Sequence, residues 1–116
     1  MSILDKIVSR KREEVALAKQ MVSIKQLEAS SVFTRKPLIF RDFLLDDTRT
    51  GIISEFKRRS PSKGLINGTA DVATVTQAYS AAGASALSVL TDTDFFGGKA
   101  DDLIAARAVN QIPILR

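Results

Sequence analysis

From residue 52 onward, segments with the character of a strand alternate with segments with the character of a helix. Residues 52–56 combine β-branched and aromatic side chains, and residues 84–91 form a continuous small and apolar run. A third strand opens at residues 113–116, where proline stands at the tolerated first position. Helical patterns fill residues 71–82 and 101–108 between the strands. This order predicts an α/β fold in which right-handed crossovers connect the strands of a parallel sheet.

Each helical segment carries apolar side chains at helical spacing, which predicts a face that packs on the sheet. The side chains that define these faces are Val72, Val75, Tyr79, Ala82, Leu103, Ile104 and Ala108. Gly83 follows the first of these helices and is expected to supply its left-handed stop. The uninterrupted apolar run between the helices is typical of a strand buried on both faces, as in parallel sheets.

The part of the chain before the first strand has a helical pattern. Ser2 begins a capping-box sequence, which predicts a helix over roughly the first twenty residues. Shorter helices are predicted after Ser23 and at residues 40–45. We therefore expect a helical N-terminal extension over residues 1–50, and strand–helix units over residues 51–116.

The composition excludes several kinds of site. The chain contains no cysteine and no histidine, so we expect no disulfide, no Cys/His metal site and no histidine-based triad. The 17 Lys and Arg residues outnumber the 13 Asp and Glu residues, and the net charge of +4 suits anionic partners such as phosphorylated metabolites. The charged amino-terminal segment lacks an uninterrupted apolar core, so neither a signal peptide nor a membrane span is predicted, and a cytoplasmic protein is expected.

The first strand ends in charged residues and leads into a basic loop that contains Ser-Pro-Ser-Lys-Gly. Because side chains alternate along a strand, Glu55 and Lys57 are expected to share one face, while Ser54 and Phe56 share the other. A charge pair at the carboxyl end of an apolar strand is costly unless it is paired, near water or useful. Such a pair is more often a solvated ion pair at a strand end than a catalytic pair, and Glu55 and Lys57 are candidates for both roles.

The same loop carries a resemblance to a known family. Residues 52–64 contain Glu-Phe-Lys-Arg-Arg-Ser-Pro-Ser, followed by Ser-Val-Leu-Thr-Asp at 88–92, Phe-Phe-Gly-Gly at 95–98 and Ile-Pro-Ile-Leu-Arg at 112–116. A Lys-Arg-Glu-Glu segment in the first predicted helix and Phe-Arg-Asp-Phe at 40–43 extend the match over essentially the whole chain. In this order the segments resemble indole-3-glycerol phosphate synthase of tryptophan biosynthesis.

This resemblance implies the amino-terminal part of a (β/α)₈ TIM barrel of about 250 residues, truncated in its third strand. It also implies a carbon–carbon lyase, more narrowly a carboxy-lyase. The family's reaction closes the indole ring of 1-(2-carboxyphenylamino)-1-deoxyribulose 5-phosphate with loss of carbon dioxide and water. The implied partner is a phosphorylated small molecule, with no metal, no organic cofactor, no nucleic acid and no membrane.

The resemblance also implies roles for individual residues. Lys57 matches the first-strand lysine, which binds substrate charge and donates a proton in the dehydration half of the reaction. Glu55 matches the neighbouring glutamate, which keeps the lysine charged and oriented. Ser60 and Phe96 match positions that line the substrate pocket, and Phe96 offers a ring face to the anthranilate ring.

The chain departs from the family pattern at two places. Gly97, Gly98 and Lys99 stand where the family has a polar residue followed by Gly-Ser. The family's third strand runs on into Lys-Asp-Phe, whose lysine is the principal general acid, and this sequence stops at Arg116, directly before that position. We therefore expect a piece of a longer protein that is inactive by itself.

Non-enzymatic alternatives remain open on the sequence alone. An unfinished parallel sheet exposes barrel edges, which favours a self-associating half-barrel. A small phosphate-binding domain is a further alternative. A nucleic-acid patch at residues 57–63 is disfavoured, because no aromatic platform or recognition helix accompanies the basic residues.

Overall fold

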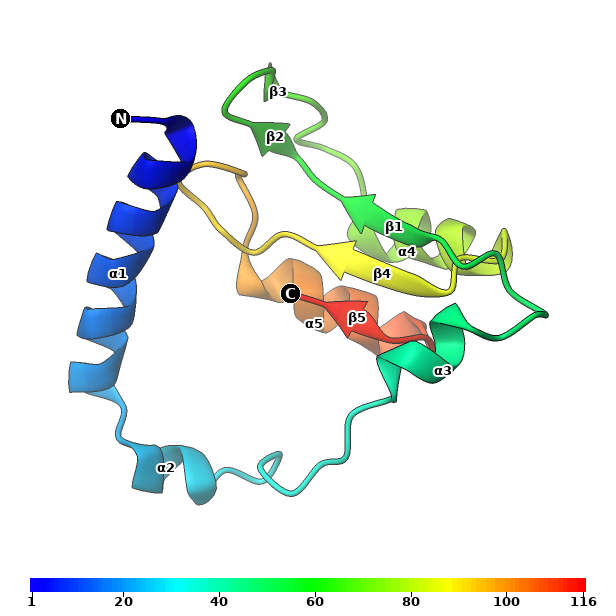
Figure 1. Cartoon of the computed structure of the whole chain (residues 1–116), viewed down its shortest axis with the longest axis horizontal. Helices are drawn as coiled ribbons and strands as arrows, with labels where there is room; N and C mark the ends of the chain where they lie inside the picture. Colours follow the sequence, from blue (N-terminus) through cyan, green and yellow to red (C-terminus); the bar gives the residue numbers. More distant parts are fainter. The chain divides into compact units, whose positions relative to one another are not determined.

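The helices and strands fall into two units, Met1–Lys36 and Pro37–Arg116, in a computed structural model that describes all residues from Met1 to Arg116 (Figure 1). The elements are α1 (Ile3–Met21), α2 (Ile24–Glu28), α3 (Phe40–Leu44), β1 (Ile53–Phe56), β2 (Arg59–Ser60), β3 (Gly64–Leu65), α4 (Val72–Ala81), β4 (Ala86–Val89), α5 (Ala100–Val109) and β5 (Ile114–Leu115). No helix combines the length and the apolar character needed to cross a membrane.

The first unit consists of two capped helices and a following run of turns. The Ser2 hydroxyl accepts a hydrogen bond from the Asp5 backbone N–H at 3.1 Å, and the Asp5 carboxylate accepts one from the Ser2 N–H at 2.8 Å. Ser23 and Gln26 form the same reciprocal pair at the start of α2. Both predicted helix starts are confirmed, because a capping box satisfies backbone donors that the first turn leaves unpaired.

The second unit is organised around a parallel sheet with strand order β1-β4-β5. The register pairs Glu55 with Ser88 and Leu87 with Ile114. All four residues of the central strand β4 are buried, as its continuous apolar sequence predicts. The observed order of strands and helices therefore confirms the expected α/β class and the parallel sheet.

One face of this sheet is covered by α4 and α5, which pack against each other beside β1 and β4 (Figure 1). The core on this face contains Phe56, Val72, Val89 and Ala106. Gly83 follows α4 with a φ of 100°, which confirms the predicted left-handed stop. The opposite face carries side chains such as Ile53 and Leu115, which are exposed.

The helix faces differ from the prediction at four positions. Ala82, Ile104 and Ala108 are exposed, whereas Thr76 is fully buried. The Thr76 hydroxyl donates to the Val72 carbonyl at 2.7 Å and accepts from the Asn110 amide at 2.9 Å. A polar side chain satisfied in this way can occupy the interface between α4 and α5, which an apolar pattern alone does not reveal.

Asp71 caps α4 and makes the stability of the second unit sensitive to acid. Its carboxylate accepts hydrogen bonds from the Thr74 hydroxyl and from the Thr74 N–H, the latter at 2.9 Å, and these bonds lower the pKa of Asp71 below its ordinary value. A carboxyl group whose pKa is lower in the folded state stabilises the fold fully above its unfolded pKa of about 4. That contribution is lost as the pH falls through the lower folded pKa.

We therefore expect the thermal unfolding midpoint to fall as the pH is lowered below about 4, and Asp71→Asn to reduce this fall. Asparagine still caps the helix, but its amide does not titrate. The measurement is the unfolding midpoint between about pH 2 and 6, with Asp47→Asn as the control because Asp47 is exposed and caps no helix. Parallel curves for the wild type and Asp71→Asn would contradict the expectation.

Candidate active site

Glu55 and Lys57 lie side by side at the carboxyl end of β1, on the sheet face opposite the helices. The Lys57 Nζ atom is 3.7 Å from the Glu55 Oε1 atom, and the two side chains are 34% and 44% exposed, respectively. Strand alternation therefore places the two charges as the sequence predicts. At this distance and exposure the pair is held by electrostatic attraction, and water has access to it.

A third side chain completes this arrangement from the neighbouring strand. Ser88, on β4, stands directly across from Glu55 in the parallel register. Its Oγ–H donates to the Glu55 Oε2 atom at 3.0 Å. The two carboxylate oxygens of Glu55 therefore face different partners, Lys57 on one side and Ser88 on the other.

Ser60 lies in a hairpin that follows β1. The short strands β2 and β3 pair antiparallel, with Ser60 opposite Gly64, where the sequence predicts only a turn. Ser60 is buried, and its hydroxyl accepts from the Lys63 N–H at 3.2 Å and lies 3.4 Å from the Ser62 hydroxyl. The structure thus gives Ser60 partners within its own turn and does not join it to Glu55 or Lys57.

Phe96 lies in the loop between β4 and α5, which is joined to the loop after β1. The Arg59 N–H donates to the Phe96 carbonyl at 3.2 Å. The Asp92 carboxylate accepts from the backbone N–H groups of Phe95 at 2.8 Å and Phe96 at 3.3 Å, so the loop folds around its own first residues. Both loops follow parallel strands, and this bond connects them beyond the carboxyl ends of those strands.

Gly98 allows the same loop to pass close to the end of β4. A Cβ atom at Gly98 would lie 2.0 Å from the Leu90 carbonyl oxygen, which is backbone and cannot swing away. Glycine is therefore required here by close packing of two backbone segments. In the part of the loop where the family pattern has a polar residue followed by Gly-Ser, this chain has Gly97 and Gly98.

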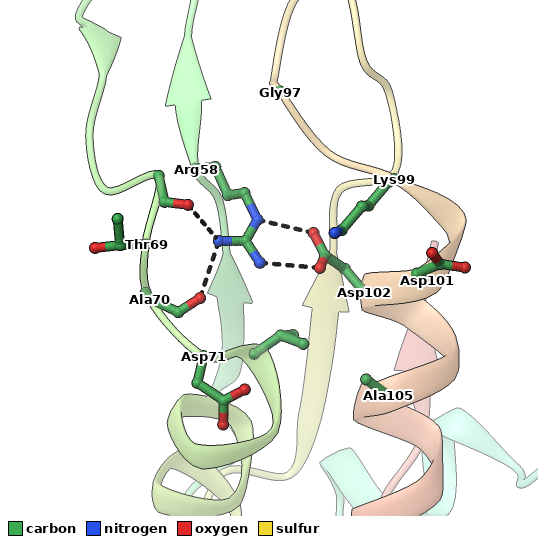
Figure 2. Close-up of a pocket in the computed structure, with 11 residues that line it drawn as sticks. Arg58, Thr69, Ala70, Asp71, Gly97, Lys99, Asp101, Asp102 and Ala105 are labelled. Atoms are coloured by element: carbon green, nitrogen blue, oxygen red, sulfur yellow. Dashed lines mark hydrogen bonds and ion pairs between the residues drawn. The ribbon is translucent and has the colours of Figure 1, made fainter.

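Arg58 fastens the carboxyl end of β1 to the helix layer (Figure 2). Its guanidinium donates two hydrogen bonds of 2.9 Å to the two carboxylate oxygens of Asp102, on α5. The same group donates to the carbonyls of Gly68 at 3.2 Å and Ala70 at 2.9 Å, before α4. It also lies 4.9 Å from the centroid of the Phe56 ring.

This Arg58–Asp102 pair is largely removed from water, since the two side chains are only 14% and 3% exposed. The hydrogen bonds that Arg58 donates to the Asp102 carboxylate raise the pKa of the Arg58 guanidinium above its ordinary value, although burial acts in the opposite direction. A forked, two-bond pairing fixes direction as well as distance. The residue next to Lys57 is therefore rigidly held.

A cleft of about 530 Å³ lies beside this pair, between the loop before α4 and the start of α5 (Figure 2). Arg58, Asp71, Lys99 and Asp102 are among the residues that line it. By alternation, Arg58 lies on the same side as Phe56, which is the side covered by the helices. This cleft and the Glu55–Lys57 pair therefore lie on different sides of the sheet.

Sequence reasoning missed three residues of this region: Arg58, Ser88 and Asp102. In the sequence, Arg58 is one of several basic residues of the loop. Its partner, Asp102, lies 44 positions later, so no local pattern connects the two. Ser88 gave a weak signal, a hydroxyl inside an otherwise apolar strand. Only the strand register shows that it meets Glu55.

Comparison with known proteins matches this chain to one family. A family model described as indole-3-glycerol phosphate synthase matches residues 4–116. Proteins named indole-3-glycerol phosphate synthase are similar to it in Bacteroides thetaiotaomicron (47% identical, covering 98% of this chain and 44% of the relative) and Carboxydothermus hydrogenoformans (40% identical, 97% and 45%). The relative from Acaryochloris marina is 43% identical, with 98% of this chain and 38% of the relative covered. The chain therefore spans less than half the length of these curated relatives.

Proposed function

The chain belongs to the indole-3-glycerol phosphate synthase family, and from this premise we propose that it supplies the first-strand part of that enzyme's active site. The observation that carries the proposal is the Glu55–Lys57 pair, which lies at the carboxyl end of β1 with its charges 3.7 Å apart. Enzymes built on a (β/α)₈ barrel place their active sites at this end of the strands. The proposed activity is that of a carbon–carbon lyase, more narrowly a carboxy-lyase.

In the proposed reaction, 1-(2-carboxyphenylamino)-1-deoxyribulose 5-phosphate forms a carbon–carbon bond between its aryl ring and its sugar carbonyl carbon. Carbon dioxide leaves the ring, the former carbonyl oxygen takes up two protons and leaves as water, and the adjacent carbon of the sugar chain loses one proton as the indole double bond forms. Lys57 binds the negatively charged carboxylate and donates a proton as the hydroxyl departs. Glu55 directs the Lys57 ammonium group toward the substrate.

Ser60 and Phe96 are proposed to line the substrate pocket. The bond between the Arg59 N–H and the Phe96 carbonyl supports this assignment, because it joins the two loops that carry these residues. Phe96 would offer a ring face to the aromatic part of the substrate. For Ser60 to contact substrate, its hydroxyl must exchange its turn partners, Ser62 and the Lys63 N–H, for a substrate oxygen.

We also propose that the whole protein contains the remaining strands of a closed barrel. In this proposal, residues 1–50 form the helical extension and residues 51–116 form the first part of the barrel. A closed barrel would cover the sheet face that carries Glu55 and Lys57. Relatives more than twice as long as the matched region have the length for such closure. The isolated chain would then bind or turn over substrate poorly, because most of the pocket wall would be missing.

The experiment uses a hybrid protein, in which residues 1–116 are joined to the part of the Bacteroides thetaiotaomicron relative outside the matched region. We expect the purified hybrid to convert the carboxyphenylamino substrate into an indole product, detected by fluorescence, and the isolated chain to show no turnover. A folded hybrid without activity, beside an active Bacteroides relative, would overturn the proposed function.

Self-association of the isolated chain is the second proposal, and the open sheet supports it. Strands β1 and β5 are the two edges of the sheet, and each carries an exposed apolar side chain, Ile53 in β1 and Leu115 in β5. Unpaired strand edges with apolar neighbours recruit other chains. Light scattering should show a mass above that of one chain that falls on dilution, and a stable monomer at all concentrations would contradict this.

A further inference from the structure

Ser88 places a hydroxyl group on one face of β4, where packing alone does not require a polar side chain. In β4, Leu87 and Val89 point to the helix layer, where they belong to the two core clusters. Ala86 and Ser88 alternate with them and therefore share the face of Glu55. Ala86 shows that a methyl group suffices to fill a buried position in this row.

The hydroxyl of Ser88 is 3.0 Å from the Glu55 Oε2 atom, and the residue is only 6% exposed. An ionised carboxylate accepts hydrogen bonds and donates none, so the serine must be the donor. On its other side, Ser88 stands beside Leu115 of β5, whose side chain has no polar atom. The bond to Glu55 is thus what the buried hydroxyl is placed to make.

Glu55 itself is not held by burial, since its side chain is 44% exposed. The gap of 3.7 Å between its Oε1 atom and the Lys57 Nζ atom is longer than a hydrogen bond, so this attraction alone does not fix direction. A donor on the neighbouring strand does fix it, because a hydrogen bond to Oε2 turns Oε1 toward Lys57. A neutral donor does this without competing with Lys57 for the negative charge.

The geometry points to Ser88 as a positioning residue, which orients Glu55 by a hydrogen bond and through it sets the place of the Lys57 ammonium group. This inference rests on the proposed function of Glu55 and Lys57. Ser88 is not assigned contact with the substrate. Its effect on the reaction passes through Glu55.

The first test measures kcat and KM of the hybrid protein with Ser88→Ala. We expect kcat to fall about tenfold, while KM and the thermal unfolding midpoint stay close to those of the unmodified hybrid. Ser88→Thr keeps the hydroxyl and should recover most of the lost kcat. Ser85→Ala is the matched control, because Ser85 is also buried but its hydroxyl accepts from the Gly51 N–H at the other end of the sheet. It should lower the midpoint and leave kcat unchanged.

A double-mutant cycle shows whether Ser88 acts through Glu55. In a hybrid that already carries Glu55→Ala, adding Ser88→Ala should change kcat little. An equal tenfold loss in both backgrounds would overturn the inference, as would an unchanged kcat in Ser88→Ala alone.

The isolated chain separates this inference from the proposed function. Three-bond NMR couplings that report χ1 of Glu55 should indicate one rotamer in the wild type and averaging in Ser88→Ala. If the hybrid shows no turnover, the proposed function fails, but these couplings still decide the positioning claim. Couplings that are averaged in the wild type, or identical in the two proteins, would overturn it.

Discussion

Replacing Lys57 by methionine should lower kcat of the hybrid protein by a factor on the order of 10²–10⁴, the range typical of a lost proton donor. Methionine keeps the unbranched stem of the side chain and removes its positive charge. Lys57 is one-third exposed and contributes little to the core, so the free energy of unfolding should change by no more than about 0.5 kcal/mol. The measurements are initial rates at saturating substrate and urea denaturation.

The control for this prediction is Lys63→Met, which removes a lysine from the same exposed loop. It should retain the rate of the unmodified hybrid, because its ammonium group is not paired with Glu55. If Lys57→Met kept more than about one-tenth of the wild-type rate, Lys57 would not be the proton donor that we propose.

Replacing only one member of the Arg58–Asp102 pair should lower the free energy of unfolding more than any other substitution proposed here. Arg58→Met leaves the Asp102 carboxylate, only 3% exposed, without its partner, and it also frees the carbonyls of Gly68 and Ala70. Removing one member of a buried ion pair typically costs about 3–5 kcal/mol in the free energy of unfolding. Denaturant unfolding of the isolated chain measures this cost.

The combined change Arg58→Met and Asp102→Leu should recover part of that loss, because it leaves no unpaired buried charge. Asp101→Ala is the matched control: the neighbouring carboxylate is exposed, and its removal should change stability by no more than about 0.5 kcal/mol. A loss below about 1 kcal/mol for Arg58→Met would show that the pair does not anchor the carboxyl end of β1.

Features set by neighbouring residues could be predicted from the sequence. The capping boxes of α1 and α2 depend on side chains three positions apart, and both are present. Alternation along β1 is equally local, and it places Glu55 and Lys57 on one face as expected. The order of strands and helices, and the buried central strand, followed from hydrophobic pattern and turn residues.

Features set by long-range pairing could not be predicted. The bond from Ser88 to Glu55 joins residues 33 positions apart, and it exists because of the sheet register. The buried position of Thr76 depends on Asn110, whose amide reaches it from the end of α5. Ile104 is exposed although it matched an apolar helix face, because α5 buries Asp102 and Ala106 instead. The last two outcomes depend on which side of each helix packs inward.

The resemblance to the family leads to what local pattern could not give, namely the reaction that we propose for the Glu55–Lys57 pair. The match over residues 4–116 shows the family. In the structure, the two charges meet at the carboxyl end of the first strand. The Ser88 hydroxyl donates a hydrogen bond to Glu55, and Arg58, next to Lys57, pairs with Asp102.

Contact between Lys57 and the reacting molecule can be measured directly by NMR on the hybrid protein labelled with ¹⁵N-lysine. The Lys57 Nζ signal is identified by its absence in Lys57→Met, and indole-3-glycerol phosphate is then added. We expect this signal to shift as the ligand saturates, while the signal of Lys63 stays in place. A hybrid that binds the ligand with the Lys57 signal unmoved would contradict the assignment of this residue to the active site.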